Sequence, residues 1–457
     1  MATTPNYVLL QKITVGATTA ASVTFSNLNT LTGYTDLKIV LSARGNLGQV
    51  YSNLYLQLNG DSTTGHYGSK ALYSTGAATG VGANISGTTL MYCGTVTGAN
   101  ATANAFGNAE IYIPNFNVSS ANKAISVDST MENNATSSYL TMANGVFTPS
   151  TSGTVTSATI FLDGGYYFQQ YSTFSLYGLA AVGTTPVVAP YAIGGDIIKT
   201  DGTYWYHAFL SSGSFTPNKS LSCDVLVVAG GGAGGAVGGG GGAGGVLGFA
   251  SQALAANTAL TATVGAGGTG TAASGTNGNN SSFGSITPVA VGGGGGGGYG
   301  FNGSAGGSGG GAGWNGTTLQ TGGTGSQGNN GGNSNNSNNT SASRGEGGGG
   351  GAGGNGGSAT TPGTGGIGGN GVNSNATFTN LSTALSTLGL GVSGYIAGGG
   401  GGEGFSVAGT AGSGGGGTGG ASGNGTSAVA NTGSGGGGGT SAGGTGGSGL
   451  IILRYAI

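Results

Sequence analysis

Three glycines in the middle of the chain follow an apolar run at the spacing of a phosphate-binding loop. Gly230, Gly232 and Gly235 satisfy the pattern G-x-G-x-x-G, and they come directly after DVLVVA, which reads as a buried strand. In a dinucleotide-binding fold, a helix begins at such glycines and its N-terminus holds the pyrophosphate. The chemistry that this spacing offers is therefore nucleotide binding.

The residues after this motif exclude that chemistry. The chain continues as GGAGGVLGFASQALAANTALTATVGAGG, and each interior glycine costs a helix about 1 kcal/mol relative to alanine. An acidic residue about twenty positions further on, needed to bind ribose, is also missing, because the next acid after Asp224 is Glu346. With 112 glycines among 457 residues the spacing arises by chance, and we reject the nucleotide-binding interpretation.

Other residues that could do chemistry are few. Only 4% of the residues are charged, the formal net charge is -2 and there are two histidines, which disfavours nucleic-acid binding. Asp128 with Glu132, or Asp163, could form the carboxylate pair of a fibre depolymerase, but one sequence does not give their separation. His207 has no second histidine nearby with which to hold a metal. We expect no enzymatic activity, no metal and no cofactor.

Charge divides the chain into two regions. Lysines stop at Lys219, and the region beyond Asp224 is almost uncharged. VGTTPVVAPYAIGGD carries two of the eight prolines between them. We predict a β-sandwich at residues 1–182, a linker at 183–198 and a glycine-rich domain at 199–457.

The first region reads as about nine short strands. Alternation is clearest where Leu54, Leu56 and Leu58 face one side while Tyr55 and Gln57 face the other. β-Branched and aromatic residues, turn signals such as Asn-Gly-Asp and the lack of helical periodicity predict an antiparallel sandwich of jelly-roll type.

Several isolated polar residues have simple structural explanations. Cys93 and Cys223 are expected to be buried thiols, because neither has metal-ligand neighbours. Asp36 and Arg44 bracket one predicted strand, and we expect both at a solvated edge.

The glycine-rich region begins and ends with strands. GTYWYHAFLSSGSFTP is predicted to be a hairpin, with Tyr204, Trp205 and Tyr206 packed at the base of the domain. KSLSCDVLVVA then leads into the glycine runs, and LIILRYAI closes the chain. We expect these opening and closing strands to pair.

The tract between them has two interpretations. Glycine and serine mixtures can form a flexible linker, but about 220 disordered residues between two paired strands is an unusual loop. The ordered alternative is a bundle of polyglycine helices in the polyproline II (PPII) conformation, which has three residues per turn and no internal hydrogen bonds. Such helices must bond to their neighbours, and close approach requires the absence of β-carbons. We therefore predict an all-β fold combined with a PPII bundle.

The segments DGTYWYHAFLSSGSFTPNKSLSCDVLVVAGGGAGG, TATVGAGG, SSFGSITPVAVGGGGGG and GGSGLIILRY resemble the glycine-rich domain of tailed-bacteriophage tail fibre and adhesin (receptor-binding) proteins, over about residues 200 to 457. AEIYIPNF, ISVDSTMENNAT and YSTFSLYGLA are more loosely similar to a β-sandwich of phage virion proteins. The resemblance implies a compact sandwich of polyglycine helices whose loops contact receptors on the bacterial surface, and a homotrimer. The chain lacks a coiled-coil shaft and a long fibre repeat, so the resemblance implies a short fibre, a tip or a head decoration.

Candidate receptor-binding residues are the bulky or charged side chains near the glycine runs. Exposed aromatic rings stack on sugars, and neighbouring asparagines supply polar contacts. The alternative is that these rings plug the end of the bundle or pack between subunits, and that Arg344 pairs with Glu346, two positions away. The predicted receptor-binding set is Tyr299, Phe301, Asn302, Trp314, Asn315, Arg344, Tyr395, Glu403 and Phe405.

These observations predict a phage virion protein. It would be a tail fibre or adhesin that binds a host cell-surface glycan or outer-membrane protein, with the sandwich contacting other virion proteins or further copies of the chain. The sequence shows no secretory signal and no stretch of roughly 18 apolar residues, so we expect no membrane insertion. The alternatives are a head fibre or decoration protein with a purely structural role, and an ice- or surface-binding protein, for which the threonine spacing is too irregular.

Overall fold

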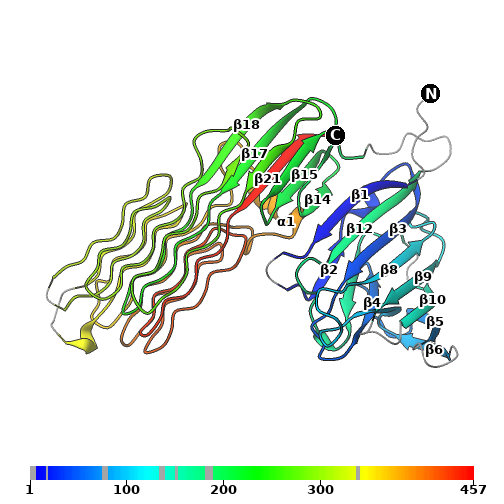
Figure 1. Ribbon diagram of the computed structural model, residues 1–457, viewed down its shortest axis with the longest axis horizontal. Coiled ribbons are helices and arrows are strands. Elements are labelled where there is room, and N and C mark those ends of the chain that lie inside the picture. The colour runs from blue at the N-terminus through cyan, green and yellow to red at the C-terminus, as the bar shows by residue number, and fades with distance from the viewer. Residues whose placement is uncertain are drawn as a thin grey trace. The chain divides into compact units, whose positions relative to one another are not determined.

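The chain forms two compact units, which we describe separately. The computed structural model describes residues 7–16, 19–74, 81–132, 139–149, 153–180, 189–316, 318–335 and 340–457. The β unit comprises Met1–Pro190, Asp196–Trp205 and Ala456–Ile457, and the glycine-rich unit comprises Tyr191–Gly195 and Tyr206–Tyr455 (Figure 1). Residues 183–188 of the predicted linker lie outside the described residues.

Two antiparallel sheets build the β unit. The larger contains, in spatial order, β14 (Ile197–Thr200), β1 (Tyr7–Thr14), β12 (Thr173–Ala180), β3 (Tyr34–Ala43), β8 (Gly107–Ile113), β9 (Lys123–Met131), β10 (Tyr139–Phe147), β5 (Tyr67–Ser74) and β6 (Val81–Thr88). The smaller contains β2 (Ser22–Phe25), β11 (Ala158–Leu162), β4 (Tyr51–Leu58) and β7 (Met91–Thr97). The prediction of antiparallel β-structure is confirmed.

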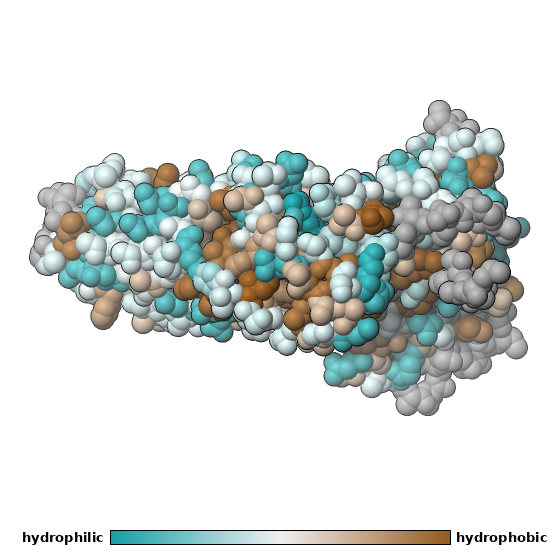
Figure 2. Space-filling view, turned by 90° about the horizontal axis from the view of Figure 1, so that it is seen from above, coloured by the Kyte–Doolittle hydropathy of each residue, from teal (hydrophilic) through white to brown (hydrophobic). Residues whose placement is uncertain are grey.

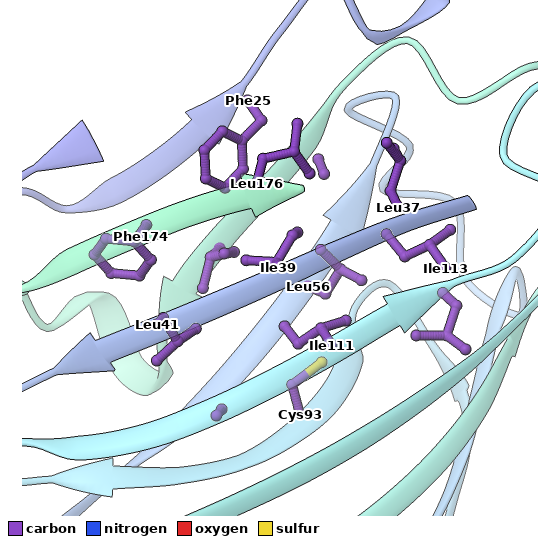
Figure 3. Packing of buried hydrophobic residues seen from close by; sticks show 14 of the residues in the cluster. Phe25, Leu37, Ile39, Leu41, Leu56, Cys93, Ile111, Ile113, Phe174 and Leu176 are labelled. Carbon is purple, nitrogen blue, oxygen red and sulfur yellow. The ribbon is translucent and has the colours of Figure 1, made fainter. Parts of the chain in front are cut away.

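The core of the β unit is apolar and alternates as the sequence predicts. Leu54, Leu56 and Leu58 of β4 are fully buried, and the residues between them are partly exposed. Leu56 lies near Ile39 of β3 and Cys93 of β7, so both sheets contribute to one core (Figure 3). Cys93 and Cys223 are free, buried thiols, as expected, and burial raises the pKa of both.

Besides β14, which overlaps the end of the predicted linker, three strands of this unit are absent from the sequence prediction. β5, β6 and β7 contain YGSKALYS, VGANISGT and MYCGTVT, in which glycine and serine interrupt the apolar alternation. Their ladder hydrogen bonds to neighbouring strands decide the conformation, because strand propensity depends on context.

Arg44 and Asp36 do not lie at a solvated edge. β3 lies between β12 and β8, inside the larger sheet. The Arg44 guanidinium is buried and donates to four backbone carbonyls, those of Ala99, Ala101, Thr102 and Ala105. Asp36 accepts hydrogen bonds from the Tyr112 hydroxyl and the Asn115 amide. Each charged group therefore holds a loop in place.

Strands close the base of the glycine-rich unit. β17 (Leu221–Val228) pairs antiparallel with β18 (Val246–Leu254) on one side and β21 (Leu450–Ala456) on the other, with Asp224 opposite Arg454. The predicted pairing of opening and closing strands is confirmed. β15 (Tyr204–Phe209), which belongs to this unit from Tyr206 onward, lies beside β21, and Tyr206 is buried there; Trp205 is buried as well.

The predicted hairpin at GTYWYHAFLSSGSFTP is wrong. β15 and β16 (Gly213–Pro217) lie in different sheets, since β16 pairs with β13 (Ala192–Ile193) and β19 (Leu260–Thr263), and β19 pairs with β20 (Ser282–Phe283). Alternating apolar residues can be buried whether the two strands share one sheet or lie in two. The pattern therefore did not distinguish a hairpin from a crossing between sheets.

One short helix, α1 (Leu381–Leu388), was not predicted. It buries Leu381, Leu385 and Leu388 and ends at Gly389, whose φ of 71° is left-handed. A glycine in that conformation is a common helix stop, so GL after LSTALSTL was the available signal. In the described part of the chain, no helix is long and apolar enough to cross a membrane.

The glycine runs form extended segments that lie side by side (Figure 1). The amides of Gly230 and Ala233 donate to the carbonyls of Asn279 and Thr276, at 3.0 Å each. Gly231 and Gly234 donate to Gly447 and Gly444, at 2.9 and 3.0 Å, while Gly232 and Gly235 donate to Gly242 and Gly239, at 2.8 and 2.9 Å. Every third amide thus donates to the same neighbouring segment, and the amides of this run together reach three segments.

Glycine is required at these crossings because the backbones approach closely. A β-carbon on Gly311 would lie 2.0 Å from the carbonyl oxygen of Gly347, and one on Gly231 would lie 2.0 Å from that of Ser434. The tract is therefore a folded, hydrogen-bonded structure and not a flexible linker.

His207 links two parts of the base. Its Nδ1 lies 2.7 Å from the Gly194 carbonyl oxygen and its Nε2 lies 2.9 Å from the Tyr455 hydroxyl. The imidazole is fully buried, and burial lowers its pKa to about 4. The ring is therefore neutral in the folded protein.

We expect Gly311→Ala to destabilise the glycine-rich unit by at least about 1–3 kcal/mol, the cost of overpacking an interior. The matched control is Gly423→Ala, because a β-carbon at Gly423 meets nothing within 4 Å. Denaturant titration of the full chain measures both. Equal stability of the two variants would contradict close packing at Gly311.

Lowering the pH should destabilise the glycine-rich unit through His207. Between the unfolded pKa near 6.5 and the folded pKa near 4, the unfolded state binds more protons, so stability falls as the pH falls. The loss is roughly 3 kcal/mol at 1.36 kcal/mol per pKa unit. Hydrogen exchange of β17 and β21 amides measures it. His207→Gln should abolish this dependence, whereas His66→Gln, in the β unit, should leave it unchanged.

Candidate binding end of the glycine-rich unit

Turns distant in sequence meet at the end of the glycine-rich unit opposite its base, which we call the far end (Figure 1). The Tyr299 amide donates to the Ala236 carbonyl at 3.1 Å, and the Gly300 amide donates to the Trp314 carbonyl at 2.8 Å. The Glu403 amide donates to the Gly238 carbonyl at 3.1 Å. The up-and-down path of the glycine segments therefore gathers these residues at one end.

Two aromatic residues project from one far-end turn. Gly300, with a φ of 80°, reverses the chain between Tyr299 and Phe301, and the Phe301 amide donates to the Gly298 carbonyl at 3.0 Å. Tyr299 is 57% exposed and Phe301 is 65% exposed. Both side chains are available for binding, and their binding role stays a prediction.

Trp314 is buried, as in the alternative that the aromatic rings plug the end of the bundle. Its side chain is only 7% exposed, and its ring lies edge-on to Tyr299, with ring centroids 5.9 Å apart. Trp314 therefore packs inside the far end. Its Nε1 has no hydrogen-bond partner among the described residues.

The two predicted asparagines differ in their surroundings. Asn302 is exposed, and its Oδ1 accepts a hydrogen bond from the Thr321 amide at 2.8 Å, so it holds the neighbouring turn. Asn315 is partly exposed beside Trp314. Neither position excludes contact with a ligand.

Arg344 pairs with Glu403 and not with its sequence neighbour Glu346. The Arg344 Nη2 lies 2.7 Å from the Glu403 Oε1, and the guanidinium carbon lies 5.5 Å from the centre of the Phe405 ring. Glu403 and Glu346 are both fully buried. Glu403 therefore cannot contact a receptor without local opening, whereas Phe405, 40% exposed, can.

Tyr395 does not belong to this end. It pairs with Val392 in a tight turn, and a β-carbon on the adjacent Gly394 would contact Ser382 of α1. α1 lies near the base, where Arg454 of β21 stacks over Phe378 at 4.3 Å. Which end of the unit each turn occupies does not follow from the order of the residues.

Sequence reasoning missed several exposed aliphatic residues near the glycine runs, among them Leu319 and Val407. Leu319 is 46% exposed and Val407 is 54% exposed. An apolar residue within a polar turn, as in TTLQTGG and GFSVAGT, was the available signal. Figure 2 shows the surface of the glycine-rich unit as mostly pale and teal, with scattered brown patches, so exposed apolar residues stand out.

The considered catalytic and metal-binding residues are not brought together. Asp128 lies on β9 and Glu132 directly follows it, so their backbones are about 13 Å apart at 3.3 Å per residue, whereas the carboxyl groups of glycosidase pairs are roughly 5–9.5 Å apart. Asp163 follows β11 of the other sheet. Among the residues that the structure describes, no three His, Cys, Asp or Glu side chains cluster as a metal site.

No curated protein is significantly similar to the chain. The sequence profile of the glycine-rich domain family, however, matches residues 210–456, which is more than half of the chain and covers β17, β21 and all the glycine runs between them. The chain therefore belongs to the glycine-rich domain family.

Proposed function

We propose that the chain is a virion protein of a tailed bacteriophage, either a tail fibre or an adhesin that binds a host cell-surface glycan or outer-membrane protein through the far end. The observation that carries this proposal is the exposure of Tyr299 and Phe301 on one reversing turn, beside other turns from distant parts of the chain. Exposed aromatic residues are enriched at binding hot spots.

The scaffold in this proposal is a polyglycine II bundle. Support comes from the three-residue hydrogen-bond period between residues 230 and 235, since PPII helices have three residues per turn. A β-carbon on Gly231 or on Gly311 would lie 2.0 Å from a carbonyl oxygen of a neighbouring segment, which fits the same packing. A scaffold bonded through its backbone leaves the turn sequences free to vary with the receptor.

Few charges lie near the proposed contact surface. Arg344 is already paired with Glu403, so stacking and apolar contact are the interactions that Tyr299, Phe301 and Phe405 can offer. Aromatic faces suit the C–H faces of sugar rings, and Asn302 or Asn315 can add polar contacts. We therefore favour a glycan over a charged protein surface.

The β unit, in this proposal, is a jelly-roll-like sandwich that contacts other virion proteins or further copies of the chain, with a trimer as the expected assembly. Leu72 of β5 and Met142 of β10 are cross-strand partners, 63% and 52% exposed, and Leu140 and Val146 are also exposed on β10. Exposed apolar patches of this kind mark protein–protein contact sites.

A head fibre or decoration protein with a purely structural role is the second candidate. The burial of Trp314 and Glu403 favours it, because these side chains stabilise the far end instead of extending from it. Both candidates place the chain on the outside of a virion.

The full-length double variant Tyr299→Ala, Phe301→Ala should lose at least tenfold in binding to bacterial cells. Fluorescently labelled protein and a panel of Gram-negative strains measure this by flow cytometry. The matched control is Ile367→Ala, since Ile367 is 58% exposed but lies between the two ends of its segment. If the parent protein binds no strain, the structural candidate replaces the adhesin. If the double variant binds like the control, the far-end turn is not the contact.

A further inference from the structure

Two glutamates with no exposed surface face each other inside the far end. Gly345 and Gly404 form an antiparallel bridge, and the Glu346 amide donates to the Glu403 carbonyl at 3.1 Å. Both side chains have 0% exposure, and the antiparallel bridge beside them makes Glu346 and Glu403 directly opposed positions, whose side chains are neighbours. Two of the eleven acidic residues of the chain are thus buried together in a nearly uncharged region.

The charges in this cluster do not balance if both glutamates are ionised. Arg344 supplies one positive charge to two carboxyl groups, and it is the cation that acts on Glu346 among the described residues. Unpaired buried charge is strongly unfavourable. One further positive charge would make the cluster neutral.

The hydrogen bonds lead to the same conclusion. The Glu403 Oε1 accepts from the Arg344 Nη2 at 2.7 Å and from the Thr440 hydroxyl at 3.0 Å. The Glu403 Oε2 and both carboxyl oxygens of Glu346 have no donor among the described residues. Two carboxylates cannot bond to each other, because neither has a proton to donate. A protonated carboxyl group can.

We propose that Glu346 carries a proton in the folded protein and donates it in a hydrogen bond to the Glu403 Oε2, which locks the far end closed. The bond joins the turn that contains Arg344 to the turn that contains Phe405, and Thr440 ties a third segment to the same carboxylate. When Glu346 ionises, its proton passes to bulk water and leaves two buried carboxylates for one guanidinium. The far end then opens locally to hydrate the unpaired charge.

A proton fits this cluster better than a metal ion. Calcium needs six to eight oxygen ligands, and two carboxyl groups provide at most four. One of those four, the Glu403 Oε1, already accepts from both Arg344 and Thr440. The arginine would also repel a cation placed between the glutamates.

The pH dependence follows from the direction of the Glu346 shift. Burial, then the Glu403 charge, raises the pKa of Glu346 well above its usual value near 4.5. Above the unfolded pKa, the folded state binds more protons, so stability falls as the pH rises from about 4.5 towards the folded pKa. His207 acts oppositely below about pH 6.5, and comparison of variants at equal pH removes its contribution.

Hydrogen exchange of the full chain between pH 5 and 9 tests this lock, with peptides covering residues 340–350 and 400–408 as readout. Glu346→Gln keeps a neutral donor, so it should protect these peptides more than the parent at high pH. The protection ratio should change about tenfold per pH unit below the folded pKa, while base peptides from β17 and β21 should match. Equal protection of parent and variant across this range would overturn the proposal.

A second variant separates the shared proton from burial alone. In Glu403→Gln, Glu346 remains as the acid beside Arg344 and can ionise as its partner. This variant should therefore lose the pH dependence of the far end. Persistence of that dependence would overturn the shared proton. Stabilisation of the parent, but not of Glu346→Gln, by added CaCl2 at pH 8 would overturn it in favour of a cation. This inference concerns far-end stability and does not rest on adhesion.

Discussion

The need to satisfy every buried backbone amide and carbonyl governs the glycine-rich unit. A run such as Gly230–Gly235 makes no bonds within itself, so each peptide group must find its partners in neighbouring segments. The segments can come that close only without β-carbons, as Gly311 against Gly347 illustrates. Because each bond contributes only on the order of 1 kcal/mol, stability comes from the number of bonds. Glycine content therefore determines how closely the segments pack, and the bulky side chains gather at the two ends of the unit.

The two ends consequently have different chemistry. At the base, β17 and β21 provide a β-sheet with apolar burial, and Arg454 binds Asp224 at 2.9 Å while it stacks over Phe378. This joins residues 230 positions apart. At the far end, the aromatic ring of Trp314 and the Arg344–Glu403 pair fill the space between turns. Rings and charges that looked like ligand contacts are in part the structure of this end.

This arrangement supports the proposed binding surface. The turn that carries Tyr299 and Phe301 is attached to Ala236 and Trp314 through backbone bonds, so its aromatic rings project from an ordered support. Ordering these rings in advance lowers the entropy lost on binding. A lock such as the Glu346–Glu403 contact would let the same support respond to pH without any change in the bundle that carries it.

The sequence by itself determined the antiparallel strands with clear alternation, as in β4, the buried thiols, and the pairing of the segments that open and close the tract. These features depend on local periodicity and apolar content, which a single sequence displays. It did not determine β5, β6 and β7, where glycine and serine hide the alternation, or the burial of Trp314 and Glu403. Glycine runs are interchangeable in sequence, so only backbone hydrogen bonds between distant segments decide which runs are neighbours. The tertiary structure alone therefore decided which side chains meet at the far end and which of them face solvent.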